Sequence, residues 1–237
     1  MEHLWLRVRA PFAAYRPMQA GALRATLPMM PYSAAWGLVL NLAGVETRHG
    51  LDQPTTGIDP AAPPLRLALG LPGLEPESGS LYQQAHGYPV GKSGEDLQAR
   101  THGAKYWIAP VRREVLIGLD IVIAVQADPS ICHRVDDGLM GRGDWRRYGL
   151  PFAGDNNLLF DQIDVVREVP RCRWYVPVNL KEPPRRGATR LTRAIDRSDS
   201  SRTESDLVAP QNDAVAVPPE GAWKWTPRPP TNRSARP

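Results

Sequence analysis

The feature that most constrains the fold is an apolar run from Val115 to Gln126, whose centre reads IGLDIVIAV. Isoleucine and valine dominate this run, and β-branched residues favour extended backbone. A run of this length and composition is typical of a buried strand. We therefore predict a central strand here, preceded by a second strand from Tyr106 to Val111.

The start of the chain predicts a half-buried strand, because side chains of two kinds alternate between Glu2 and Ala10. One face carries Leu4, Leu6 and Val8, and the other carries Trp5, Arg7 and Arg9. Further strands are predicted at Leu65–Leu71, Ile163–Val166 and Cys172–Val178.

Two helices are predicted between these strands. Ser33 is placed to cap an apolar helix that runs to about Ala43, in which Gly37 would allow a neighbouring element to approach closely. Asp128 or Ser130 is placed to cap a second helix that runs to Met140. The order strand, helix, strand, strand, helix, strand predicts an α+β fold of the ferredoxin-like (RRM-like) plan, a common home of RNA-binding sheets.

The last part of the chain, residues 181–237, has a different composition. It holds nine prolines and few aliphatic residues, and it includes the polar run RSDSSRTESD from Arg197 to Asp206. Such a segment buries too little apolar surface to offset the entropy lost on ordering. We predict a flexible, low-complexity tail rich in Pro, Arg and Ser, and a folded domain over residues 1–180.

The charge of the chain also divides at this point. The predicted tail holds 11 Lys and Arg against 7 Asp and Glu, whereas the predicted folded domain holds 18 of each. The net charge of +4 therefore resides in the tail. Any nucleic-acid site in the folded domain must rest on local clusters of arginine, because that domain is neutral as a whole.

Composition also bears on the class of protein. Cys132 and Cys172 are 40 positions apart with no second pair, so neither a zinc knuckle nor a disulfide framework is indicated, and both are expected to be reduced. The chain begins directly with the alternating strand, and no apolar run approaches a membrane span in length. We expect a cytoplasmic protein with no membrane contact and no cofactor or metal.

The candidate functional segment is a glycine- and arginine-rich loop over residues 138–157, GLMGRGDWRRYGLPFAGDNN. Five glycines allow the backbone to approach a ligand, Arg142, Arg146 and Arg147 match phosphate geometry, and Trp145 and Tyr148 offer stacking faces. This combination favours binding of single-stranded nucleic acid. The structural alternative, an arginine-rich surface loop with a buried Trp, stays open. The loop is not a nucleotide-binding P-loop, because no Lys follows its glycines.

Two motifs carry a family resemblance. Phe12 and Arg16 in RAPFAAYRP, followed by PYSAAWGLVLNLAGVE from Pro31 to Glu46, resemble the CRISPR-associated Cas-five family of the RAMP superfamily. RYGLPFAGDNN, from Arg147 to Asn157, resembles the DevS-like branch of that family. The resemblance covers about residues 1–180.

The resemblance implies a RAMP domain in a subunit of type I Cascade. Members of the family bind and cap the 5′ handle of CRISPR RNA and contact the Cas-seven backbone subunit and the Cas-eight-type large subunit, with target DNA near the PAM as a further partner. They carry an inserted thumb-like hairpin, which maps here onto residues 81–104.

On this basis we predict two sets of site residues. The RNA-binding set is Arg16, Arg142, Trp145, Arg146, Arg147, Tyr148, Asn156 and Asn157. The thumb contacts are Tyr82, His86, Tyr88, Lys92, His102 and Lys105.

Catalysis is an alternative, because one branch of the family cleaves precursor CRISPR RNA without metal through Tyr, Lys and His. Proton transfer to and from the ribose and the leaving oxygen suits these side chains. The chain offers His102, Lys105 and Tyr106, but their spacing departs from that of the cleaving branch, and the DevS-like motif points to systems with a separate Cas-six nuclease. We therefore predict a non-catalytic RNA-binding subunit, with a metal-independent endoribonuclease as the alternative and a purely protein-binding role as a third possibility.

Overall fold

The chain folds around one large antiparallel sheet. The computed structural model describes residues 1–17, 24–50, 52, 56–87, 107–147, 149–183 and 185–230. The sheet consists of β1 (Glu2–Ala13), β4 (Leu65–Leu71), β5 (Glu77–Gly87), β6 (Trp107–Ala127), β7 (Gln162–Val165), β8 (Arg173–Pro177), β9 (Thr189–Ala194), β10 (Glu204–Pro210) and β11 (Lys224–Thr226). Its order is β7-β1-β6-β4-β8-β10-β9, with β5 beside β6 and β11 beside β4. The remaining elements are helices α1 (Tyr32–Leu42) and α3 (Pro129–Leu139), the short pair β2 (Arg48–His49) and β3 (Gly57–Ile58), and the 3-10 turns η2 (Ser200–Arg202) and η3 (Glu220–Ala222). The mixture of sheet and helix agrees with the predicted α+β class.

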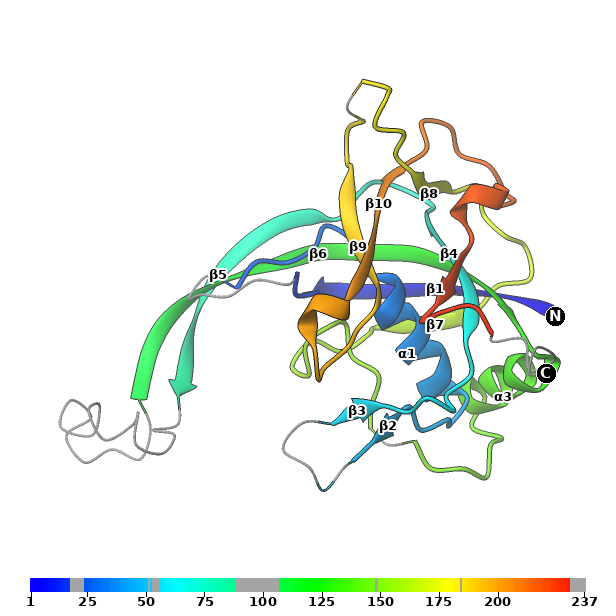
Figure 1. Ribbon diagram of the computed structural model, residues 1–237, viewed down its shortest axis with the longest axis horizontal. Coiled ribbons are helices and arrows are strands. Elements are labelled where there is room, and N and C mark those ends of the chain that lie inside the picture. Colours follow the sequence, from blue (N-terminus) through cyan, green and yellow to red (C-terminus); the bar gives the residue numbers. More distant parts are fainter. Residues whose placement is uncertain are drawn as a thin grey trace, which may run out of the picture.

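β6 is a single strand of 21 residues where the sequence predicted two. The polar residues Arg112, Arg113 and Glu114 interrupt the apolar pattern, but pairing with β5 from Trp107 to Ile117 keeps this part extended. The second half of β6 pairs with β1 and β4 and is the predicted central strand. Figure 1 shows β5 and the first half of β6 leaving the body as a curved arm. Of the expected thumb, residues 81–87 belong to β5, and residues 88–104 lie outside the described residues.

The main core lies between the helices and one face of the sheet. Leu6 and Val8 of β1 are fully buried, and Trp36, Val39 and Leu40 of α1 are buried as predicted. A smaller core lies on the other face and consists of Ala68, Val122, Ala124, Cys172, Trp174 and Ala222, with Trp5 and Trp223 packed against it.

The two helix starts differ in how well the sequence predicted them. Asp128 caps α3 by accepting a hydrogen bond from the Ser130 N–H at 2.9 Å, as predicted. The Ser33 prediction is wrong, because α1 begins at Tyr32 after Pro31 and has no side-chain cap. The prediction for Gly37 is also wrong, since a Cβ placed there would meet no atom within 4 Å.

The prediction of a flexible tail from residue 181 is wrong for residues 189–226. β9 and β10 extend the sheet beyond β8, and β11 pairs with β4 in the body. Leu191, Val208 and Ala222 are fully buried. The composition of residues 181–237 is dominated by prolines and polar residues, so it does not reveal these short apolar runs. The strands that bury them are distant in sequence.

Candidate nucleic-acid interface

The glycine- and arginine-rich loop packs against the C-terminal end of α1. Arg134 of α3 donates to the carbonyl of Ala43 at 2.7 Å, and its guanidinium lies 4.4 Å from the centre of the Trp145 ring. Gly44 adopts a φ of +65°, and a Cβ there would lie only 1.7 Å from the Trp145 side chain. The Asn41 amide donates to the Gly149 carbonyl at 3.2 Å. Trp145 is therefore half-buried against the body and is engaged by cation–π contact with Arg134.

Two of the three loop arginines also contact the chain itself. Arg142 forms ion pairs with Asp136 at 2.7 Å and Asp137 at 3.0 Å, and Arg147 donates to the carbonyl of Gly138. Together with the packing of Trp145 on Gly44, these contacts are the ones expected if the segment is an arginine-rich surface loop with a buried Trp. Arg146 is exposed and has no ion-pair partner among the described residues. It is thus the arginine of this loop that presents a free guanidinium.

The root of the β5–β6 arm brings together three segments that are far apart in sequence. The Ala14 N–H donates to the Ala153 carbonyl at 2.9 Å, which joins the segment after β1 to the end of the loop. The Arg24 N–H donates to the Arg112 carbonyl at 3.1 Å, and the Glu114 N–H donates to the Arg24 carbonyl at 2.9 Å. Arg24 and the residues that follow it therefore lie alongside the middle of β6.

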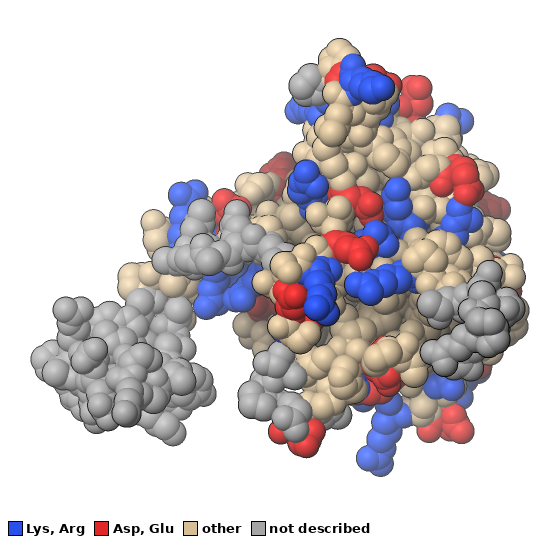
Figure 2. Space-filling model, viewed as in Figure 1, with Lys and Arg blue, Asp and Glu red and all other residues tan. Residues whose placement is uncertain are grey.

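This root carries arginines that form no ion pair with any acid in the described part of the chain. Arg16 and Arg112 are exposed and Arg24 is half-exposed, and none of them has an ion-pair partner within the ranges that the structure describes. Tyr82 of β5 is 79% exposed and lies directly opposite Arg112 in the strand register. On the face seen in Figure 2, basic side chains gather where the arm joins the body and continue, mixed with acidic ones, over β9.

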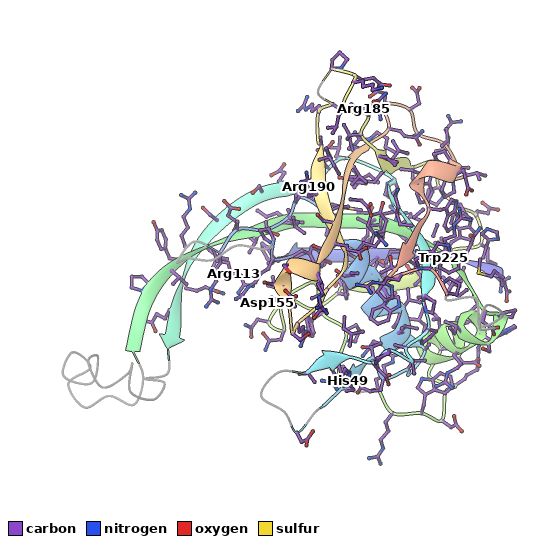
Figure 3. All side chains as sticks on the ribbon, viewed as in Figure 1. His49, Arg113, Asp155, Arg185, Arg190 and Trp225 are labelled. Carbon is purple, nitrogen blue, oxygen red and sulfur yellow. The ribbon has the colours of Figure 1, made fainter. Side chains whose placement is uncertain are left out.

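A buried ion pair underlies this surface. Arg113 pairs with Asp155, the side chains being 5% and 16% exposed, and Figure 3 shows both at the root of the arm. Arg113 also donates to the side-chain amide oxygen Oε1 of Gln83 at 3.1 Å. Burial acts to raise the pKa of Asp155, but hydrogen bonds from Asn157 and Arg113 hold that pKa below its ordinary value. The pair ties the turn at residues 154–157 to both strands of the arm.

The turn itself agrees with the local chemistry that its sequence suggests. The Asp155 carboxylate accepts from the backbone N–H of Asn157 at 3.0 Å, an Asx turn. Gly154 has a φ of +82°, and a Cβ there would lie 2.3 Å from the Ala14 carbonyl oxygen. Asn156 and Asn157 are exposed beside this contact. The turn thus presents the exposed Asn156 side chain next to the segment that carries Arg16, whereas the Asn157 amide donates to the Asp155 carboxylate at 3.1 Å.

The remaining predicted site residues are only partly described. His86 lies in β5, opposite Ile108. Tyr88, Lys92, His102, Lys105, Tyr106 and Tyr148 lie outside the described residues. The sequence analysis did not single out Arg24, Arg112 or Arg113. Arg112 and Arg113 could have been found in the sequence, because they are charged residues that interrupt an otherwise apolar run.

The outer face of the central strands is occupied by the chain itself. Arg7 of β1 forms a bidentate pair with Asp120 of β6 at 2.9 and 2.7 Å. Trp5 lies 6.4 Å from Trp223, centre to centre, and packs on the smaller core. Base stacking on this sheet face, as in RRM-type proteins, therefore has no free aromatic platform at Trp5.

Metal-binding groups do not cluster in the described part of the chain, where no three His, Cys, Asp or Glu residues are placed to hold an ion. Cys132 and Cys172 are free and buried, and burial raises their thiol pKa to about 11 and about 12. Among the described residues, no helix is long and apolar enough to cross a membrane.

Comparison with known proteins finds relatives in structure. No family model and no curated protein matches the sequence. A chain of a CRISPR RNA-guided surveillance complex matches with a TM-score of 0.53 at 16% identity, covering 93% of this chain and 96% of that chain. A Cas protein matches with a TM-score of 0.46 at 12% identity, covering 92% of this chain and 100% of that chain. The first match shows a shared fold over nearly the whole chain.

Proposed function

We propose that this chain is the non-catalytic RNA-binding subunit of a type I CRISPR surveillance complex of the Cascade kind, and that it binds and caps the 5′ handle of CRISPR RNA. The observation that carries the proposal is the set of unneutralised arginines at the root of the arm, on a fold shared with a chain of such a complex. The planar guanidinium groups of arginine match the geometry of phosphates. Tyr82, which lies opposite Arg112 in the strand register, offers an aromatic face on which a base can stack.

The topology supports the ferredoxin-like RAMP part of the proposal. β1, α1, β4, β6, α3 and β7 follow one another in that plan, and their strands lie in the order β7-β1-β6-β4. The β5–β6 arm is inserted between the second and third strands of the plan and corresponds to the thumb-like hairpin. In the proposed complex this arm contacts the guide and a Cas-seven backbone subunit, and the Cas-eight-type large subunit is a further partner.

The proposal is tested by binding of labelled 5′-handle RNA to the purified chain in EDTA. The root variant Arg16→Ala/Arg24→Ala/Arg112→Ala is compared with the control Arg167→Ala/Arg197→Ala/Arg202→Ala, which removes the same charge from other exposed positions. Each lost phosphate contact lowers the log–log salt dependence by about 0.7 for a single strand, so the root variant should lose about 2 units of slope and the control much less.

Three results would count against the proposal or part of it. Equal affinity and slope in the root variant and the unsubstituted chain would remove the root from the RNA site. A loss confined to Arg146→Ala/Arg147→Ala would move the site to the glycine-rich loop. Site-specific cutting of repeat RNA in EDTA would replace the non-catalytic subunit with an endoribonuclease.

A further inference from the structure

A second basic surface lies on the connection between β8 and β9 and on the first residues of β9, residues 181–190, which we name the basic finger. It contains Lys181, Arg185, Arg186 and Arg190. Figure 3 shows Arg185 on a protrusion of the body, away from Arg113 and Asp155 at the arm, and Arg190 at the base of this protrusion on β9. None of these four residues belongs to the proposed guide site, so an inference drawn from them does not depend on that proposal.

The finger is a built element. Asn179 begins it by accepting the Lys181 N–H on its side-chain oxygen at 3.1 Å and the Glu182 N–H on its carbonyl at 3.0 Å. At the far end, the Ala188 N–H donates to the Arg185 carbonyl at 3.3 Å, and Gly187 supplies the positive φ of +75° that this turn requires. Arg185 and Arg186 are thus presented on a closed turn.

The acids around the finger already have partners, whereas its cations form no ion pair with a described residue. Glu182 accepts from the Asn179 amide at 3.0 Å, and Glu75, which lies by Gly187, pairs with Arg173 at 3.3 Å. No acidic residue among the described parts of the chain pairs with the finger's cations, which are Lys181, Arg185, Arg186 and Arg190. Arg193, further along β9, shows the contrast, because it pairs with Glu204 at 2.6 Å and Asp206 at 3.1 Å.

The composition of the finger indicates which ligand it fits. It has four cations and no aromatic residue. Proteins that hold single strands combine cations with aromatic platforms for the exposed bases, whereas the backbone of a duplex is bound through phosphates alone. β9 is also the last strand of the sheet order, which leaves this edge without a neighbouring strand in the described structure. We propose that the basic finger binds the sugar–phosphate backbone of double-stranded nucleic acid.

The test uses the full chain and three labelled probes, namely a short DNA duplex of mixed sequence, the RNA duplex of the same sequence, and the single DNA strand. The finger variant is Lys181→Gln/Arg185→Gln/Arg186→Gln/Arg190→Gln. The control Arg167→Gln/Arg197→Gln/Arg202→Gln/Arg228→Gln removes the same charge from exposed arginines elsewhere, so both variants lower the net charge from +4 to zero. Thermal unfolding is measured first. If the finger variant is unfolded, Arg185→Gln/Arg186→Gln takes its place.

We expect the finger variant to bind duplex at least about tenfold more weakly and to lose about 3.6 units of log–log salt slope, while the control stays close to the unsubstituted chain. Binding of handle RNA should be unchanged in the finger variant, and duplex binding should survive in the Arg16/Arg24/Arg112 variant, so the two proposals fail separately.

The comparison of the DNA duplex with the RNA duplex shows which of the two nucleic acids the finger prefers. Unchanged duplex binding in the finger variant, or equal weakening in the control, would overturn the inference. Loss of a protein subunit from the assembled complex with duplex binding intact would assign the finger to an acidic protein partner.

Discussion

Arg113 and Asp155 form the most deeply buried ion pair among the described residues. Breaking such a pair leaves a charge without solvent or partner, which costs about 3 to 5 kcal/mol. We expect Asp155→Asn to lower the free energy of unfolding by that amount, measured by urea denaturation at neutral pH. Asp136→Asn is the matched control, because its side chain is 41% exposed in its pair with Arg142 and exposed pairs contribute about 0 to 1 kcal/mol.

The same pair predicts a dependence on pH. The pKa of Asp155 is lowered in the folded chain, so its stabilisation is complete above the unfolded value of about 3.9 and is lost as the pH falls through the folded value. The difference in unfolding free energy between the unsubstituted chain and Asp155→Asn should therefore be constant above about pH 5 and shrink below about pH 4. A difference that persists unchanged in acid would assign the cost to altered packing around the amide.

Gly44 and Gly141 separate backbone strain from steric collision. Both adopt a positive φ, of +65° and +67°, but a Cβ on Gly44 collides with Trp145, whereas one on Gly141 meets no atom within 4 Å. Gly141→Ala should lower the free energy of unfolding by about 1 kcal/mol because of the left-handed backbone. Gly44→Ala should lower it by at least about 1 kcal/mol more, because Trp145 must move away from Gly44. Equal losses in thermal unfolding would show that Trp145 is not fixed on Gly44.

At the scale of elements, α1 offers a substitution that should stabilise the chain. Gly37 lies inside the helix in open space, so the close approach expected from the sequence is absent. Alanine at a helix interior is favoured over glycine by about 0.5 to 1 kcal/mol. We expect Gly37→Ala to raise the free energy of unfolding by that amount in urea denaturation. A loss of stability would show that a neighbouring element packs against this turn.

Elements with a strong local pattern were predictable, and those that depend on distant partners were not. β4 matches its predicted bounds of Leu65–Leu71, and α3 begins after the predicted cap Asp128, because these signals lie within a few residues. β5 has no such pattern and is a strand because it pairs with β6. The same pairing carries β6 through Arg112 and Arg113, where the sequence predicted an end.

At the scale of the whole molecule, the candidate site was predictable only in part. Arg16 and the turn at Asn156 and Asn157 were singled out from local motifs, and the structure places their segments beside each other at the root of the arm. Arg24 and Arg112 join this surface through a strand pairing that no local pattern reveals. Conversely, Arg142 and Trp145 resemble free binding residues in the sequence, but three-dimensional contacts with Asp136 and Gly44 engage them.

The C-terminal strands determine whether residues 1–180 are a complete folding unit. Leu191 of β9 is fully buried in the main core, whereas Leu180, a short distance before it, is 82% exposed. Leu191→Ala should therefore lower the free energy of unfolding by about 2 to 5 kcal/mol, and Leu180→Ala by much less, since only the first leaves a cavity.

Truncation after Leu180 removes β9, β10 and β11 together and exposes the apolar surface that they cover on α1 and β4. The truncated chain should then unfold at a much lower temperature or aggregate. An unchanged melting temperature in both the truncated chain and Leu191→Ala would restore the view of residues 181–237 as an independent tail.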